Sequence, residues 1–244
     1  MSRWWDGWRR HREARALARR AIPDALWETC LAALPFLARR PAEQRERVRR
    51  MASLFLDRKE FSGAQGFVVT DEIALAVAAQ ACLPVLELGL DAYDGFVGIV
   101  MHRDVVVAPR EQMDEHGVVH EWHEELAGEA VDGGPLMLSW ADVLPEPAPD
   151  GVAYNVVIHE FAHVLAARSG PALLDSLMPA YDRFCERIVC GHESAIDTYG
   201  AEAPEEFFAV ASETFFVTPQ ALKEEQPALY RLLSSYYRQD PALY

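Results

Sequence analysis

Two histidines with a glutamate between them could do metal chemistry. His159, Glu160 and His163 form an H-E-x-x-H pattern. If this segment is helical, the two imidazoles lie one turn apart on one face and can reach the same ion. Zinc takes neutral imidazole nitrogens at about 2.0–2.1 Å, and catalytic zinc sites keep one position open for water. Glu160 would then be placed to take a proton from that water, whose pKa zinc lowers to about 7.

The residues around the pattern decide between a metal site and ordinary surface side chains. The pattern is flanked on both sides by apolar residues, which predicts a helix sunk in the core. Three polar side chains in a core are costly unless they share a partner, and a metal ion can satisfy all three. The alternative is a set of helix-face His and Glu side chains in salt links. We predict one zinc ion per chain.

Two histidines need a third protein ligand from elsewhere in the chain. The metzincin continuation requires Gly and His where this chain has Ala166 and Ser169, which excludes that subclass. The segment 204–216 offers Glu206 and Glu213, which are seven residues apart and therefore share one face of a helix. One of these carboxylates can bind the ion while the other orients a ligand histidine through its second ring nitrogen.

Further motifs are spread over most of the chain beyond Ile22. They lie at 79–84, 134–135, 138–140, 155–163, 196–197, 199 and 239–241, and at most positions of 204–216. Together these motifs resemble the Mlc titration factor A family of zinc metallopeptidases, and they are far more specific than H-E-x-x-H alone. The resemblance implies a zincin-like, gluzincin-type site. In that site His159, His163 and Glu206 are the ligands, Glu160 is the catalytic base, and Glu213 supports the ligands from behind.

The resemblance also suggests Tyr199 as a hydroxyl near the reacting carbonyl, where a phenol donor can stabilise the oxyanion by a few kcal/mol. The alternative is a core tyrosine with a satisfied hydroxyl. Asp197 either supports the site from behind the ligands or is only a turn residue. Three other histidines have side chains that could bind a metal, but none lies on a face shared with another candidate ligand: His120, His123 and His192.

A substrate-binding strand is expected beside the metal. In zincins the substrate backbone commonly pairs with an exposed strand edge above the metal. We predict that this edge consists of Leu136, Met137, Leu138 and Ser139. The family often has a Tyr-Pro pair after its hydrophobic strand, whereas this chain has residues 101–103 with the sequence Met-His-Arg, which leaves substrate preference near that strand open.

The elements that must position these residues predict an α+β fold with a small mixed sheet, an active-site helix and a helical N-terminal region. We expect a loop with a short extended piece in 59–70, strands at 96–101, 105–107 and 136–140, and helices from 155 onward, with a final helix capped by Thr218 and begun by Pro219. The predicted division is a basic Trp/Arg-rich arm (1–21), a helical region (22–90) and a zincin-like catalytic domain (91–244).

Charge and composition limit the functional classes. The net charge of −15 over 244 residues argues against direct nucleic-acid binding. The arm is different, because seven arginines stand against Asp6 and Glu13; it can touch a membrane surface or an acidic partner, and packing on its own acidic body is favoured. The longest apolar tract, 73–90, contains polar residues and a proline, so we predict a buried helix rather than a membrane span. Four scattered cysteines favour a reducing cytoplasm.

Three functions remain open at this point. The resemblance implies a peptidase that acts on short peptides or near an amino terminus, in the manner of an aminopeptidase. A second possibility is a regulatory protein that sequesters a transcriptional repressor, since the family is named for its action on the Mlc repressor and an acidic body suits a basic partner. The third is a zinc protein without turnover.

Overall fold

The computed structural model describes residues 2–113, 119–126, 128–130, 134–144 and 152–244. Its N-terminal part is helical, as predicted. The helices are α1 (Ser2–Arg19), α2 (Asp24–Ala33), α3 (Pro35–Ala38), α4 (Ala42–Arg58) and α5 (Asp71–Cys82). The apolar tract at 73–90 forms the buried helix α5 as far as Cys82 and then continues as turns. Thr70 caps α5, because its hydroxyl accepts a hydrogen bond from Ile73 N at 3.4 Å.

A mixed sheet of four strands follows the order β1-β2-β6-β5. The strands are β1 (Glu60–Gly63), β2 (Gly98–His102), β6 (Leu136–Ser139) and β5 (Gly128–Ala130). β1, β2 and β6 are parallel, whereas β5 is antiparallel to β6. Ile99 and Met101 of β2 and Leu136 and Leu138 of β6 are buried and alternate with more exposed residues, so one face of the sheet packs on the core.

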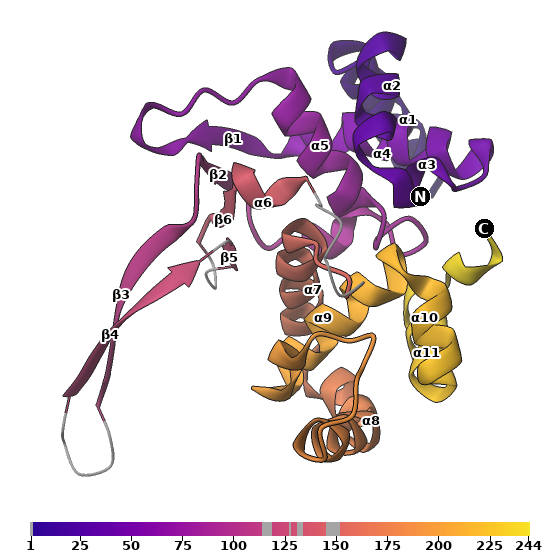
Figure 1. The fold of residues 1–244 in the computed structure, drawn as a ribbon. Helices are drawn as coiled ribbons and strands as arrows, with labels where there is room; N and C mark the ends of the chain where they lie inside the picture. Colours follow the sequence, from indigo (N-terminus) through magenta and orange to yellow (C-terminus); the bar gives the residue numbers. More distant parts are fainter. Residues whose placement is uncertain (1, 114–118, 127, 131–133, 145–151) are drawn as a thin grey trace.

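Two parts of the sheet differ from the sequence prediction. β1 lies inside 59–70, where a loop was expected, and the predicted extended piece at 67–69 is not a strand. The strand expected at 105–107 is one arm of a long hairpin made by β3 (Val106–Met113) and β4 (Val119–Leu126). Figure 1 shows this hairpin projecting away from the rest of the chain. Pairing between strands, rather than local composition, therefore sets these boundaries.

The C-terminal part is helical, and prolines begin most of its long helices. The elements are α6 (Trp140–Val143), α7 (Val156–Ser169), α8 (Pro171–Val189), η3 (Thr198–Ala201), α9 (Pro204–Val217), α10 (Pro219–Glu225), α11 (Pro227–Tyr237) and η4 (Pro241–Leu243). Proline suits the first helical position because its fixed φ is preorganised and its missing N–H would be unpaired there. The predicted start of α10 at Pro219, with Thr218 before it, is confirmed, although the Thr218 side chain makes no capping bond.

The order of helices, small sheet and helices confirms the α+β class. One hydrophobic core runs through the described chain, with members from Ile22 to Ala242, and η2 (Leu90–Tyr93) lies within it. α7 packs against α9, α5 and β5, so the helix with the H-E-x-x-H pattern contacts the N-terminal helices, the sheet and the C-terminal helices (Figure 1). The predicted division at residues 21 and 90 stays a prediction.

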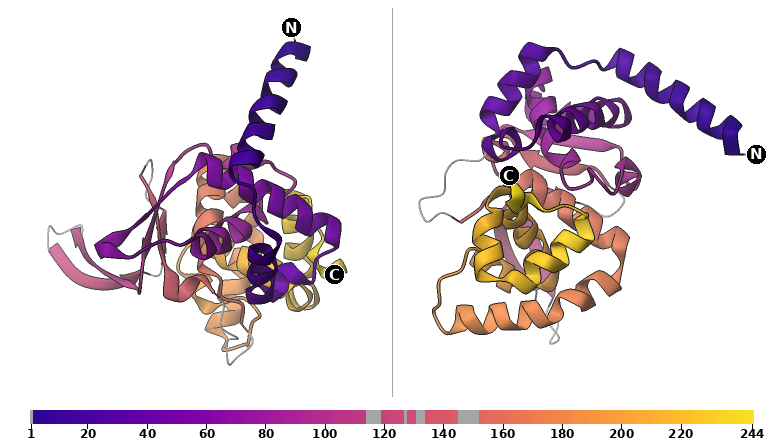
Figure 2. Two further views of the ribbon diagram at one scale, coloured as in Figure 1. Left: turned by 90° about the horizontal axis from the view of Figure 1, so that it is seen from above. Right: turned by 90° about the vertical axis from the view of Figure 1, so that its right-hand side faces the viewer.

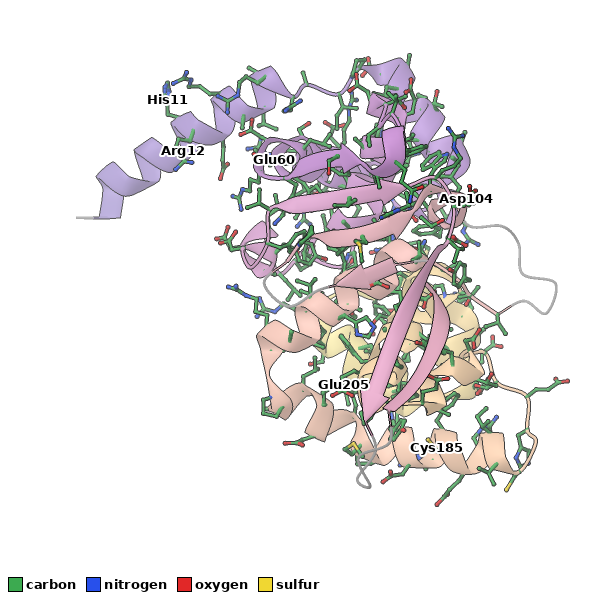
Figure 3. All side chains as sticks on the ribbon, turned by 90° about the vertical axis from the view of Figure 1, so that its left-hand side faces the viewer. His11, Arg12, Glu60, Asp104, Cys185 and Glu205 are labelled. Atoms are coloured by element: carbon green, nitrogen blue, oxygen red, sulfur yellow. The ribbon has the colours of Figure 1, made fainter. Side chains whose placement is uncertain are left out.

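The basic arm forms helix α1, which leaves the body of the protein in both views of Figure 2. His11 and Arg12 lie on this projecting helix, at the opposite end of the molecule from Cys185 on α8 (Figure 3). Nearer the body, Arg19 donates to both carboxylate oxygens of Asp57 on α4, at 2.9 and 3.0 Å. This end of the arm thus packs on the protein itself. Among the described residues, no helix is both long and apolar enough to cross a membrane.

Candidate metal centre

α7 carries the H-E-x-x-H pattern and begins with a well-formed cap. The side chain of Asn155 accepts a hydrogen bond from Ile158 N at 2.9 Å, which satisfies one of the unpaired N–H groups of the first turn. The helix ends before Gly170, whose φ of 72° suits a residue without a side chain. Its apolar residues are buried on almost every side, which confirms the predicted burial of this helix.

α9 packs across α7 and brings a carboxylate to the two histidines. His159 Nε2 lies 3.1 Å from His163 Nε2 and 3.1 Å from Glu206 Oε2, and His163 Nε2 lies 3.4 Å from the same oxygen. The structure thus joins the two imidazoles to the candidate from the later helix. Among the described residues these three form the one group of His, Cys, Asp and Glu whose geometry suits a metal ion.

The three donor atoms have the spacing that one small ion requires. Ligands about 2.0–2.1 Å from a tetrahedral centre are about 3.3–3.4 Å from one another, close to the observed separations. Two imidazole nitrogens that face each other at such a distance need a shared proton or cation between them. The side chains of His159, His163 and Glu206 are 14%, 23% and 22% exposed, so the site is recessed but reachable from solvent. It fits a metal with a free coordination position.

Glu213 lies behind His159. Its Oε1 atom is 2.8 Å from His159 Nδ1, and its side chain is 2% exposed. A carboxylate in this position accepts the Nδ1 proton and leaves the Nε2 lone pair for a ligand, so it fixes both the tautomer and the orientation of the ring. The seven-residue spacing alone did not show which of Glu206 and Glu213 would bind the ion. The fold places Glu206 at His159 Nε2 and Glu213 at His159 Nδ1.

The charges at the metal-free site are strongly coupled. Burial lowers the pKa of His159, but hydrogen bonds to Glu206 and Glu213 outweigh burial and raise this pKa to about 10. Burial raises the pKa of Glu206, yet its bonds to His159 and His163 lower it to about 2. Burial raises the pKa of Glu213. Without a metal, the two carboxylates therefore favour the protonated form of His159.

Glu160 is buried beside the start of β5. Its residue is 6% exposed, and a Cβ added to Gly128 would lie 2.5 Å from Glu160 Cγ and 2.7 Å from Oε1. Only a glycine can therefore bring the strand this close to the carboxylate. The role of Gly128 was missed in the sequence, where the short strand around it shows no alternating pattern.

Tyr199 and Asp197 lie in the turn that leads into α9. The rings of Tyr199 and His159 have their centroids 6.1 Å apart, and Tyr199 is 42% exposed, so Tyr199 is not a core residue and lies beside the site. The role of its hydroxyl stays a prediction. Asp197 accepts a hydrogen bond from Tyr199 N at 2.8 Å and caps η3. Asp197 therefore makes the contact of a turn residue, and its support of the ligands stays a prediction.

The predicted substrate edge is wrong. Leu136, Met137, Leu138 and Ser139 form β6, which is paired with β2 on one side, and its first three residues are paired with β5 on the other. The edge strand nearest to α7 is instead β5, Gly128–Ala130, which contacts that helix. A short apolar run after a glycine-rich turn made β6 recognisable as a strand, but such a run marks a buried strand at least as well as an edge strand.

Two buried amides close to the site were given no role in the sequence prediction. Asn155 and Gln80 are both fully buried, and Asn155 Nδ2 donates to Gln80 Oε1 at 2.6 Å. A signal existed for each: asparagine before a helix is a common cap, and a glutamine inside an alanine-rich apolar tract is unusual. His192 is exposed and outside the ligand group, and the side chains of His120 and His123 lie outside the described part.

Comparison with known proteins places the chain among metallopeptidases. The family model described as glucose-regulated metallo-peptidase M90 matches residues 5–238. The chain is 33% identical over 237 residues to "Mlc titration factor A" of Enterobacter sp. (strain 638), covering 90% of this chain and 88% of the relative. The protein of the same name from Cronobacter sakazakii is 34% identical over 239 residues, covering 91% and 89%. That from Pectobacterium atrosepticum is 34% identical over 231 residues, covering 88% and 86%.

Proposed function

The chain belongs to the glucose-regulated metallo-peptidase M90 family, and we propose that it is a zinc-dependent peptidase. The observation that carries the proposal is the triangle of donor atoms from His159, His163 and Glu206, with sides of 3.1 to 3.4 Å. Two imidazoles and one carboxylate are a donor set that zinc prefers in catalytic sites. When bound, zinc supplies a Lewis acid that polarises the peptide carbonyl and lowers the pKa of a water molecule.

The residues of the chain divide the remaining work. Glu160 takes the proton of the attacking water and passes it to the leaving amine, which is general acid–base catalysis by one carboxylate. The Tyr199 hydroxyl donates a hydrogen bond to the oxyanion that forms at the carbonyl. Glu213 holds His159 in its ligand tautomer. The outer edge of β5 is the place where the substrate backbone pairs, because it lies beside Glu160 and β5 has a strand partner on one side only among the described residues.

The substrate class rests on the resemblance. Short peptides, cleaved near their amino terminus, are the substrates we propose. A cytoplasmic location belongs to the same proposal, and it is supported by four cysteines that are all free thiols.

Two variants test this function. Glu206→Ala should reduce bound zinc from about one equivalent to a small fraction, as measured by elemental analysis of the purified protein. Glu160→Gln should keep zinc but lower peptide turnover by at least about 100-fold, because the general base is gone. Glu205→Ala is the matched control, since Glu205 is the exposed neighbour of Glu206 on α9. Equal zinc contents in Glu206→Ala and Glu205→Ala, or unchanged turnover in Glu160→Gln, would refute the assignment.

The relatives' name, Mlc titration factor A, supports a second candidate function, which is capture of a repressor protein. A net charge of −15 suits a basic DNA-binding partner. Binding of this kind does not need Glu160. If wild type and Glu160→Gln recover the same repressor from lysate and neither cleaves peptides, the regulatory function replaces the peptidase.

A further inference from the structure

Gln80 is a fully buried amide on α5, in the helical region far from the ligands in sequence. Its Nε2 group donates to Ala76 O at 3.1 Å and to Val143 O at 3.0 Å. Both protons of the amide are therefore used, and Oε1 must be the acceptor toward Asn155 Nδ2 at 2.6 Å. The orientation of this side chain is fixed by its neighbours.

Asn155 is fixed in the same way. Because its Nδ2 group donates to Gln80, its Oδ1 atom is the acceptor for Ile158 N, the capping bond of α7. The backbone N–H of Asn155 donates to Glu213 Oε2. One residue thus joins the amide of α5, the first turn of the ligand helix and the carboxylate of α9.

Glu213 completes the chain of hydrogen bonds, since its other oxygen accepts the Nδ1 proton of His159. The chain runs from Val143 O through Gln80, Asn155 and Glu213 to His159, and each donor and acceptor in it has a defined direction. Buried polar networks of this kind hold their members in one geometry when every member is paired. Nothing between α5 and the ligand ring is free to rotate without breaking a bond in the interior.

We propose that Gln80 is a positioning residue of the metal centre, acting on His159 through Asn155 and Glu213. This inference rests on the proposed zinc site. When Gln80 is present, it holds the side chain of Asn155, and the backbone N–H of Asn155 then points at Glu213 in one orientation. Glu213 in turn holds the His159 ring. When the amide is lost, Asn155 keeps an unpaired buried donor and gains freedom to turn, which loosens the carboxylate behind the ligand. α5 thereby contributes to zinc affinity.

A simpler role for Gln80 would be to tie α5 to α6 through the Val143 carbonyl. That role predicts a loss of stability without a specific loss of zinc affinity. Gln239 offers a matched control, because its residue is only 8% exposed, its Nε2 donates to Leu83 O at 2.9 Å and its Oε1 accepts from Arg40. Both glutamines are buried and join elements that are distant in sequence, but within the described part of the chain Gln239 makes no hydrogen bond to the ligand network.

The test compares Gln80→Met with Gln239→Met in the full chain. Methionine keeps the length of the side chain and removes the amide. Zinc affinity is measured by competition with a chelator, and thermal unfolding of the metal-free proteins reports stability. We expect both variants to lose stability, but only Gln80→Met to bind zinc about tenfold more weakly than wild type, the lower end for supporting partners of metal ligands. A zinc affinity of Gln80→Met within about twofold of Gln239→Met overturns the proposal.

Asn155→Ser tests the route and also serves if Gln80→Met does not fold. Serine keeps the cap of α7 but has no amide to bond to Gln80. We expect zinc binding by Asn155→Ser to weaken about tenfold, and the double variant to be no weaker than either single one, because both remove the same bond. Unchanged affinity of Asn155→Ser, or a loss near 100-fold in the double variant, contradicts the route. If wild type itself binds no zinc, the proposed function fails and this inference fails with it, whereas a wild type that binds zinc together with unaffected variants refutes this inference alone.

Discussion

Gly128 begins β5, at one end of the strand order, and lies directly against the Glu160 side chain. Gly128→Ala therefore tests whether Glu160 must keep its present position to act as the general base. The new Cβ would lie 2.5 Å from Glu160 Cγ and 2.8 Å from Cδ. Ordinary contact begins at 3.4 Å, so the side chain must retreat by about 0.9 Å. A displacement of about 1 Å in a reacting group can cost about 100-fold in rate, and we expect kcat to fall by that factor.

Zinc content should change little in Gly128→Ala, because the three atoms nearest to the new Cβ all belong to Glu160 and none to a ligand. Stability should fall, because the closest atom is Cγ in the middle of a buried side chain. KM should be nearly unchanged, since the backbone groups of β5 keep their outer edge. Steady-state kinetics on a short peptide, zinc analysis and thermal unfolding separate these effects.

Gly98→Ala is the matched control for this prediction. Gly98 is also a strand glycine, but its added Cβ would meet only Pro135, with the closest atom at 3.3 Å. We expect kcat of Gly98→Ala to stay close to that of wild type. A kcat for Gly128→Ala within about threefold of Gly98→Ala would refute the placement of Glu160 as the general base.

Further predictions concern the metal-free protein and the core. Zinc uptake at pH 8 should release about one proton from His159, whose pKa is about 10 without metal, and none from Glu206, whose pKa is about 2. Calorimetry in buffers of different ionisation enthalpy measures the number of protons released. A release of zero protons would contradict the prediction. Because the folded pKa of His159 is raised above 6.5, its contribution to stability is complete below pH 6.5 and is lost toward pH 10. With chelator present, unfolding over this range should depend less on pH in His159→Gln, and an unchanged slope would argue against the raised pKa. Phe161→Ala should lower the free energy of unfolding by about 3–5 kcal/mol, because its buried ring packs on Tyr93 with centroids 4.8 Å apart; a loss below about 1 kcal/mol in denaturant titrations would contradict this packing.

Local patterns predicted much of this protein. The apolar tract that became α5, the buried helix around His159 and the proline-begun helix at Pro219 all follow from periodicity and capping, which act within a few residues of the chain. The α+β class followed from the order of these elements. The family was also predicted correctly, because short motifs were enough to recognise it. A comparison of whole chains shows the same family.

Pairing between strands that are distant in the sequence could not be predicted from local patterns. β1 was expected to be a loop, and β5 is a short strand whose sequence has no alternation; each is a strand because a partner lies beside it. The substrate edge was therefore placed one strand too far inside, at Leu136–Ser139. A strand's neighbours depend on how the whole sheet is assembled, and local composition does not contain that information.

The sequence by itself determined the ligand helix, since a spacing of four residues puts His159 and His163 on one face wherever the helix lies. It also made Glu206 and Glu213, which share a face of α9, the leading candidates for the third donor, ahead of three other histidines. The spacing did not choose between these two carboxylates; the family resemblance implied Glu206, and the tertiary structure places Glu206 at Nε2 and Glu213 at Nδ1 of His159. Only the tertiary structure connected Gln80 to the site. The physical reason is the angle and depth at which α7, α9 and α5 pack: side chains from all three elements fix it jointly, and no single segment encodes it.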